Sequence, residues 1–376
     1  MNLFPDVIGQ EMAKEIFRKA IAGNRLGHAY LLYGPAGVGK RRFALAVARV
    51  LNCSKEEISS GQECPSCRRI NTFSHPDVRW LFPLPKDKTD ESWEEREERR
   101  GKLLSSVRLR PLGSESLEEV KEKSSWDFEF DKIPIISIED VRGISREINY
   151  KPFLGRKRVV IFSEADKMRI EAANAFLKIL EEPPLNTIFL LTTTRLNFLL
   201  PTILSRCQKV RFHLLKEEEI RKALTSSFAL KKEEAEVIAC LSEGSLGQAI
   251  LLLESTDLRK KGFEIFQMIS SASTTLEIIE MIESLAKTEN RQSVLHLINY
   301  LLLFYSDLLL LKEEKDSLIR NKDKLDGLKE INQKFSKQKI QEAIDFLEKM
   351  REAIIANANL LLTLLVMFLR LREMKQ

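Results

Sequence analysis

The sequence predicts an α/β domain, in which helices cover both faces of a parallel sheet, followed by regions that contain only helices. Three observations support this prediction. An apolar stretch at 29–33 runs into a glycine-rich loop and then into a helix pattern at 42–51. The apolar stretches 159–162 and 187–192 alternate with helix patterns, as the strands of parallel sheets do. After Leu214 no further strand is convincing, and leucine-rich helix patterns follow.

The glycine-rich loop has the spacing G-x-x-x-x-G-K of a phosphate-binding loop. Between a strand and a helix, such a loop directs successive backbone N–H groups toward phosphates. The residue after the lysine is usually Ser or Thr, whose hydroxyl binds Mg²⁺, but here it is Arg41. The candidate phosphate contacts are Gly34, Gly37, Val38, Gly39, Lys40 and Arg41.

A zinc-knuckle-like module follows at 53–77. Cys53 precedes the pair Cys64 and Cys67, and a C-x-x-C pair with another cysteine nearby is typical of zinc sites. A structural zinc site needs four ligands, and His75 is the remaining candidate, although His-Pro-Asp also fits a turn into a strand. Two interpretations stay open: a zinc site, or a degenerate knuckle with reduced, buried thiols.

Residues 86–132 have a different composition, because about half of them are charged, including the run 94–100. Such runs usually form solvated helices or mobile loops. We therefore expect an insertion on the surface without chemistry of its own, attached to the body through Trp93 and Trp126.

The strand at 159–162 ends in a second candidate site. In nucleoside triphosphatases such a strand delivers an Asp for Mg²⁺ and a Glu that positions the attacking water. Here Ser163 stands at the Asp position, Glu164 is retained, and Asp166 lies three residues further on. Thr194, after the next strand, is a candidate contact for a γ-phosphate or for the attacking water.

The composition excludes several classes of protein. The chain has 376 residues, of which 44% are hydrophobic, enough for two or three domains. The start lacks a signal peptide and there are five cysteines, so we expect a reducing, cytoplasmic location. The longest apolar runs, 301–311 and 360–369, are shorter than the ~20 residues of a membrane span, which predicts no membrane association. The net charge of +5 is compatible with a nucleic-acid partner but does not establish one.

Together these motifs resemble the clamp-loader branch of the AAA+ ATPases and, within it, the delta′ subunits of bacterial DNA polymerase III. The resemblance implies an AAA+ domain at 1–212, a helical lid at 213–254 and an all-α oligomerisation (collar) domain at 255–376. It is specific over residues 1–253 and general beyond them. The residues that carry it are 4–10, 25–32, 34–40, 51–53, 75–77, 159–184, 202–207 and 244–245.

The resemblance implies a subunit of a pentameric machine, within the DNA polymerase III holoenzyme, that opens the sliding clamp and places it on primed DNA. Its partners would be gamma/tau-type and delta-type subunits, the clamp and primed DNA. ATP or ADP would lie at subunit interfaces, with the adenine near Val7 and Ile8. Arg206, in a Ser-Arg-Cys motif, would reach a neighbour's nucleotide as an arginine finger. An ordinary ion-paired arginine is the alternative.

The departures from the family pattern concern hydrolysis and zinc. Arg41 and Ser163 replace two Mg²⁺-binding positions, and Gly247 stands where the family has a lid arginine. Gly61 stands where the family has a fourth zinc cysteine, so the family's four-cysteine site is incomplete in this sequence. Phosphoryl transfer depends mainly on electrostatic stabilisation, so we expect a delta′-type subunit that can bind nucleotide but does not hydrolyse it. An active gamma-type ATPase subunit is the alternative.

Overall fold

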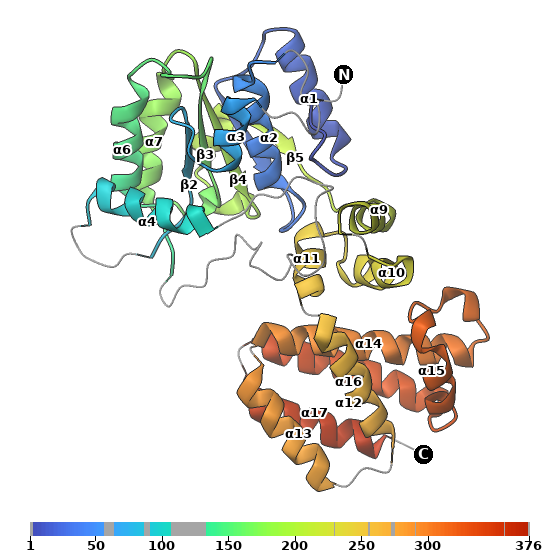
Figure 1. Ribbon diagram of the computed structural model, residues 1–376. Coiled ribbons are helices and arrows are strands. Elements are labelled where there is room, and N and C mark those ends of the chain that lie inside the picture. The colour runs from blue at the N-terminus through green and yellow to red at the C-terminus, as the bar shows by residue number, and fades with distance from the viewer. Residues whose placement is uncertain are drawn as a thin grey trace. The chain divides into compact units, whose positions relative to one another are not determined.

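The computed structural model divides the chain into two compact units (Figure 1). The first comprises Met1–Leu230 and Ser242–Gln248, and the second comprises Lys231–Leu241 and Ala249–Gln376. The described residues are 3–374 without 56–63, 86–90, 107–132, 229, 255, 272–274, 290 and 357.

The first unit is built on a parallel sheet of five strands, as the sequence predicts. The strand order is β2-β3-β4-β1-β5. In the register, Tyr30 lies opposite Leu190 on one side and Gln208 on the other. The strands are β1 (Ala29–Tyr33), β2 (Val78–Leu81), β3 (Arg158–Phe162), β4 (Thr187–Thr193) and β5 (Gln208–Arg211).

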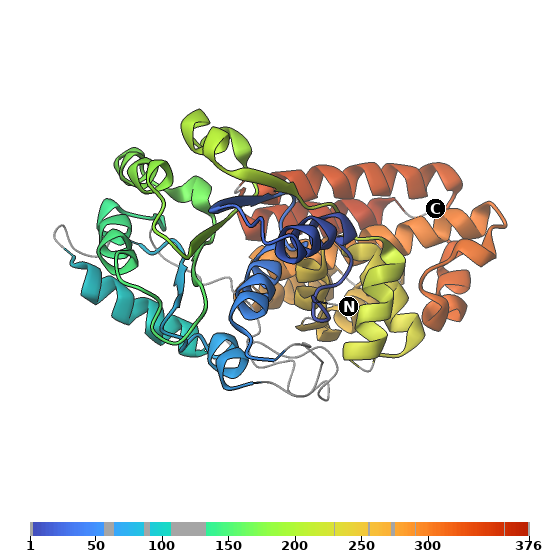
Figure 2. The same ribbon diagram turned by 90° about the horizontal axis from the view of Figure 1, so that it is seen from above.

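Helices cover both faces of this sheet (Figures 1 and 2). Alternate side chains of β3, such as Val159 and Val160, enter opposite cores, because successive residues of a strand point to opposite faces. One core includes α1 (Glu11–Ala22), α2 (Lys40–Asn52) and α3 (Pro65–Asn71), and the other includes α6 (Ile138–Ile148), α7 (Ile170–Glu181) and α8 (Pro201–Arg206).

The charged segment forms helix α4 (Trp93–Ser106), and its structure corrects the expectation of a solvated insertion. Arg96 and Arg100 are at most 1% exposed. Both donate to the carboxylate of Asp140 on α6, which is itself fully buried. Trp93 is buried against Gly143, where an added Cβ would collide with its ring, so the expected attachment through Trp93 is confirmed. Trp126 lies outside the described residues.

The first unit also contains α9 (Glu217–Ser227). The second unit is helical wherever its residues are described. Its long helix α14 packs against α12, α15 and α16. The helices are α10 (Lys232–Leu241), α11 (Leu246–Glu254, which starts in the first unit), α12 (Thr256–Ser270), α13 (Thr275–Thr288), α14 (Arg291–Lys312), α15 (Leu325–Asn332), α16 (Lys337–Ile355) and α17 (Leu360–Glu373).

Helix α14 contains a longer apolar stretch than the run 301–311 that was identified from the sequence. Its stretch Ser293–Lys312 is long and apolar enough to cross a membrane, by length and composition alone. However, 67% of that stretch is buried in the protein, and a core helix passes the same test. The leucine stripe of α14 therefore serves as the core of a helical unit, as apolar faces of packed helices do.

Candidate functional site

The phosphate-binding loop keeps the predicted strand–loop–helix shape. The loop follows β1, and α2 begins at Lys40. Gly37 and Gly39 have φ angles of +69° and +95°, which L side chains rarely adopt. The glycines of the motif are therefore required by the backbone of the loop, whatever the loop binds.

Lys40 is turned back onto its own loop. Its Nζ donates to the carbonyl oxygen of Gly34 at 2.8 Å and to that of Pro35. Burial, together with the positive charge of Arg41, lowers the pKa of Lys40 to about 8. To contact a phosphate, this ammonium group would have to leave two carbonyl partners.

Arg41 forms an ion pair with Glu164 across the end of the sheet. The same carboxylate accepts from Lys167 Nζ at 2.6 Å. The side chain that replaces the Mg²⁺-binding hydroxyl is thus bound to the glutamate that would position an attacking water. These two positions, 123 residues apart in the sequence, were both candidate nucleotide contacts, and the structure brings them together.

The remaining polar groups at this edge of the sheet are also engaged. Ser163 is fully buried, and its Oγ accepts from Trp80 Nε1 at 2.9 Å. Asp166 accepts from Thr193 Oγ1 at 2.7 Å and from Arg195 Nε at 3.0 Å. The predicted contact Thr194 is exposed beyond the end of β4, and Thr193 is the threonine that joins this network.

Gly247, which stands where the family has a lid arginine, packs directly on the phosphate-binding loop. Its N–H donates to Gly37 O at 2.9 Å, and a Cβ at Gly247 would lie 2.9 Å from Gly37 Cα. Both residues belong to the first unit. Because the two backbones meet this closely, a side chain at position 247 would push the start of α11 away from the loop.

Gln10 is a residue that sequence reasoning missed, although it ends the quoted stretch 4–10. Its Nε2 donates to Val38 O at 3.3 Å and to His213 O at 2.7 Å, and its Oε1 accepts from His213 N at 3.1 Å. Val7 is buried and Ile8 is half-buried. Gln10 thus connects the segment with the predicted adenine contacts, Val7 and Ile8, to Val38 of the phosphate-binding loop.

Arg206 ends α8, and its Nη2 pairs with Glu181 Oε1 at 2.7 Å. The side chain is 35% exposed and that of Glu181 is 52% exposed, so the pair faces solvent. In the register, β5 begins beside Tyr30, whereas the phosphate-binding loop follows Tyr33. Four residues of strand span roughly 13 Å. Arg206 therefore lies at the edge of the sheet away from its own loop.

The three knuckle cysteines are buried together. The Sγ atoms of Cys53, Cys64 and Cys67 all lie within 4.8 Å of one another, and those of Cys53 and Cys64 are 3.9 Å apart. Sulfurs of a tetrahedral zinc site are separated by about 3.8 Å, since Zn–S is about 2.3 Å. Burial raises the pKa of the Cys64 thiol, but hydrogen bonds from Ser54 and Cys67 outweigh it and bring this pKa to about 6.

His75 does not complete this set, which corrects the weaker zinc prediction. Its Nε2 is 2.9 Å from Ser66 Oγ, and its Nδ1 accepts from Asp77 N at 3.1 Å. Within the described ranges, the group that can hold a metal consists of the three cysteines alone. Over the part of the chain that the structure describes, a fourth ligand for a closed zinc site is not present, and no function is derived from zinc.

The first unit and the helical region each match a known family. Residues 9–216, more than half of the chain, match the family described as "DNA polymerase III, delta subunit". The chain belongs to this family. Residues 256–373 match "DNA polymerase III, delta subunit, C terminal". The predicted fold class, an AAA+ domain with a helical C-terminal region, is confirmed.

Several relatives of this delta-subunit family member carry the names gamma and tau. The DNA polymerase III subunit tau of Bacillus subtilis is 26% identical over 92% of this chain and 57% of its own length. Subunit tau of Escherichia coli is 27% identical over 79% of this chain and 40% of its own length. The chain thus spans about half the length of these curated relatives. A gamma subunit-related protein of Thermotoga maritima has a TM-score of 0.44 and 21% identity, covering 98% of this chain and 100% of that one.

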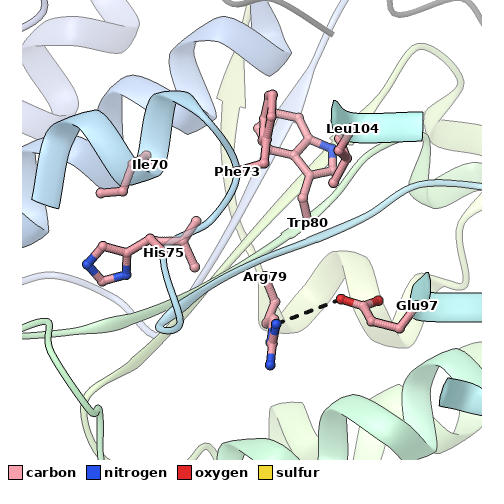
Figure 3. Close-up of a pocket in the computed structure, with 8 residues that line it drawn as sticks. Ile70, Phe73, His75, Arg79, Trp80, Glu97 and Leu104 are labelled. Carbon is pink, nitrogen blue, oxygen red and sulfur yellow. Dashed lines mark ion pairs between the residues drawn. The ribbon is translucent and has the colours of Figure 1, made fainter. Parts of the chain in front are cut away.

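A small cavity lies beside His75, at the sheet edge formed by β2 (Figure 3). Its volume is about 30 Å³, enough for a single water rather than for a substrate. Arg79 and Glu97 form an ion pair of 3.8 Å at its wall. The lining residues are Ile70, Phe73, His75, Val78, Arg79, Trp80, Glu97 and Leu104.

Proposed function

We propose that this chain is a delta′-type subunit of the DNA polymerase III clamp loader, which takes part in loading the sliding clamp but does not hydrolyse ATP. The ion pair between Arg41 and Glu164 is the observation that carries the proposal. It occupies two positions that Mg²⁺-dependent hydrolysis requires, because one should bind the metal and the other should position water. Membership of the DNA polymerase III delta-subunit family supports the clamp-loader part of the proposal.

The loss of catalytic groups extends through the whole candidate site. Hydrolysis in this class relies on a metal ion and fixed charges to stabilise the transferring phosphoryl group. Here Ser163 is buried against Trp80, and Asp166 is held by Thr193 and Arg195. Neither group is placed to bind Mg²⁺.

Nucleotide binding by this chain would be weak and independent of Mg²⁺. The contacts proposed for ATP or ADP are the backbone N–H groups of the loop and Lys40, with the adenine near Val7 and Ile8. Binding would have to break the hydrogen bonds that Lys40 makes to its own loop. The contact between Gly247 and Gly37 also covers part of the loop.

Arg206 gives the chain a role in a neighbour's site. A guanidinium at the edge of the domain can reach a nucleotide bound by the adjacent subunit and offset charge on its phosphates. The partners we propose are gamma/tau-type and delta-type subunits, the sliding clamp and primed DNA. The helical region 255–376 would hold the subunits together, as a collar.

An active gamma-type ATPase subunit is the second candidate, and the names of the relatives favour it. The pairing of Arg41 with Glu164 argues against it. The two candidates differ in whether the chain itself turns over ATP.

Clamp loading by a reconstituted loader tests the proposal. We expect gamma/tau-type and delta-type subunits from the same source to load the clamp onto primed DNA efficiently only when this chain is added. The Lys40→Ala variant should support loading as well as the wild-type chain does, because its loop takes no part in turnover. A loader that works equally well without the chain, or fails with Lys40→Ala, contradicts the proposal.

A further inference from the structure

Glu181 is the carboxylate that holds the side chain of Arg206. Its Oε1 accepts from Arg206 Nη2 at 2.7 Å, while Arg206 Nη1 donates to the backbone carbonyl oxygen of Thr202 at 3.2 Å. The guanidinium is thus held at both of its terminal nitrogens. Its direction is fixed by these contacts, although the side chain is 35% exposed.

The end of helix α7 determines the position of Glu181. The helix ends at Glu181, and Pro183 and Pro184 follow shortly after. A proline disfavours helical backbone in the residue before it, so the helix cannot include Glu182. Accordingly, Glu182 has a φ of −122° and a ψ of 72°, outside the helical region. The prolines therefore make Glu181 the last helical residue.

The backbone of Arg206 is fixed by buried residues on either side of it. Helix α8 packs against α7. Ile203 and Cys207 are buried in the same core as Ile179 and Leu180 of α7. Because these contacts set the position of α8, Arg206 starts from a defined place beside the end of α7.

The stability of the fold does not explain a carboxylate at this place. The C-terminal end of a helix carries partial negative charge, which disfavours a glutamate there. Pairing with Arg206 offsets this effect, but Glu181 is 52% exposed, and exposed ion pairs contribute little to stability. The effect of Glu181 on the fold is small, whereas its effect on the direction of Arg206 is immediate.

Holding the arginine lowers the cost of any contact that it makes with another molecule. A free arginine side chain has many rotamers, and losing them opposes every contact that fixes the guanidinium. Glu181 and the Thr202 carbonyl remove part of this freedom in advance. Such preorganisation leaves more of the interaction energy for the contact itself.

The held guanidinium still has donors to offer. A guanidinium carries five N–H bonds in a planar fork. The contacts with Glu181 and with the Thr202 carbonyl use one N–H bond each. The others can face an incoming phosphate, so Arg206 can contact a phosphate without leaving its carboxylate. Glu181 is in this respect a support for the arginine and not a competitor of the phosphate.

We propose that Glu181 is a positioning residue, which directs the guanidinium of Arg206 toward the phosphates of the neighbouring subunit's nucleotide. This inference rests on the proposed function, because the nucleotide belongs to the neighbour. It adds a second residue of this chain to that site. Glu181 acts through Arg206 and does not touch the nucleotide.

Single-turnover ATP hydrolysis tests the positioning role, in a reconstituted loader whose neighbouring site alone keeps its phosphate-binding lysine. We expect Glu181→Ala to lower the rate at saturating ATP by about tenfold, since a misplacement of about 1 Å can cost up to about 10²-fold. The ATP concentration that gives half of the maximal rate should change little, because the finger acts on charge during phosphoryl transfer. The loss should be smaller than in Arg206→Ala, which removes the guanidinium itself.

Two further variants separate positioning from a general effect of charge. Glu181→Gln keeps an oxygen that can accept from Arg206, so it should restore most of the rate. The matched control is Glu182→Ala, because Glu182 is the adjacent carboxylate and is also exposed. A loader with this variant should hydrolyse ATP as the wild-type loader does.

The isolated chain gives a readout that does not depend on a loader. The NMR signal of the Arg206 Nε–Hε group, identified by its loss in Arg206→Lys, reports how freely the side chain moves. Motion should be restricted in the wild-type chain and in Glu181→Gln, and it should increase in Glu181→Ala. A signal that is equally restricted in Glu181→Ala would show that another group holds Arg206, and it would overturn the positioning role.

The hydrolysis outcomes separate this role from the proposed function. If Glu181→Ala has the wild-type rate in a loader that Arg206→Ala disables, the positioning role is wrong and the function stands. A rate above that of the wild type would also overturn the role, because Glu181 would then withhold Arg206 from the nucleotide. If Arg206→Ala itself leaves the rate unchanged, the arginine finger of the proposed function fails, and Glu181 has nothing to position.

Discussion

Replacing Arg206 with alanine is expected to lower ATP hydrolysis at the neighbouring subunit's site by about 10³-fold or more, the range seen when arginine fingers are removed. In the proposed arginine-finger role, the guanidinium would offset charge on the transferring phosphoryl group, for which alanine provides no substitute. In the first unit, Arg206 lies roughly 13 Å from its own loop along the strands, and it contacts the exposed side chain of Glu181 and the carbonyl oxygen of Thr202.

The measurement is single-turnover hydrolysis by a loader in which only the neighbour's site keeps its phosphate-binding lysine. Arg211→Ala, which removes another exposed arginine of the same domain, is the control and should leave the rate unchanged. Folding of Arg206→Ala should be normal, because exposed ion pairs contribute only about 0–1 kcal/mol. If the rate is unaltered in Arg206→Ala, the arginine-finger proposal is wrong and Arg206 is an ordinary ion-pair partner of Glu181.

Replacing Asp140 with alanine should lower the free energy of unfolding of the first unit by about 3–5 kcal/mol, the effect of removing one member of a buried ion pair, although Arg96 keeps Glu91 and Arg100 keeps Glu97 as second partners. Asp140 accepts from Arg96 Nε at 2.8 Å and from Arg100 Nη2 at 2.6 Å. Both guanidinium groups are buried, so neither can exchange the lost carboxylate for water. Denaturant unfolding of the full chain, followed by a probe in the first unit, measures the loss.

Glu94→Ala is the control, because Glu94 belongs to the same helix but its pairing with Arg146, at 4.0 Å, is exposed; it should change stability by less than about 1 kcal/mol. Burial raises the pKa of Asp140, but the charges of Arg100 and Arg96 outweigh burial, so this pKa is lowered overall. The stabilisation is therefore present above the pKa of the unfolded chain and is lost as pH falls through the lowered folded pKa. A loss below about 1 kcal/mol for Asp140→Ala would contradict the structural role of the network.

Local patterns were sufficient to predict the sheet and the phosphate-binding loop. Strand β3 is short, apolar and rich in β-branched residues, and Gly37 and Gly39 of the loop have backbone angles that other residues avoid. The unusual residue Arg41 could also be recognised from the sequence, because its place directly after Lys40 of the motif is normally taken by Ser or Thr.

The pairings across the fold were not predictable in this way. The charged run at 94–100 was taken for solvated surface, because nothing near it in the sequence shows that Asp140 will neutralise Arg96 and Arg100. His75 was proposed as a ligand, yet both ring nitrogens are engaged elsewhere. Gly247 was interpreted only as a loss, whereas the fold requires a glycine there for contact with Gly37.

Steady-state ATP hydrolysis by the isolated chain tests the central claim most directly, with the Lys40→Ala variant measured beside it. Lys40→Ala removes the loop's only motif lysine, so any turnover that belongs to this site must depend on it. The account predicts no turnover above background for the wild-type chain and the same residual signal for both proteins. Robust turnover by the wild-type chain that Lys40→Ala abolishes would contradict it and establish an active gamma-type ATPase instead.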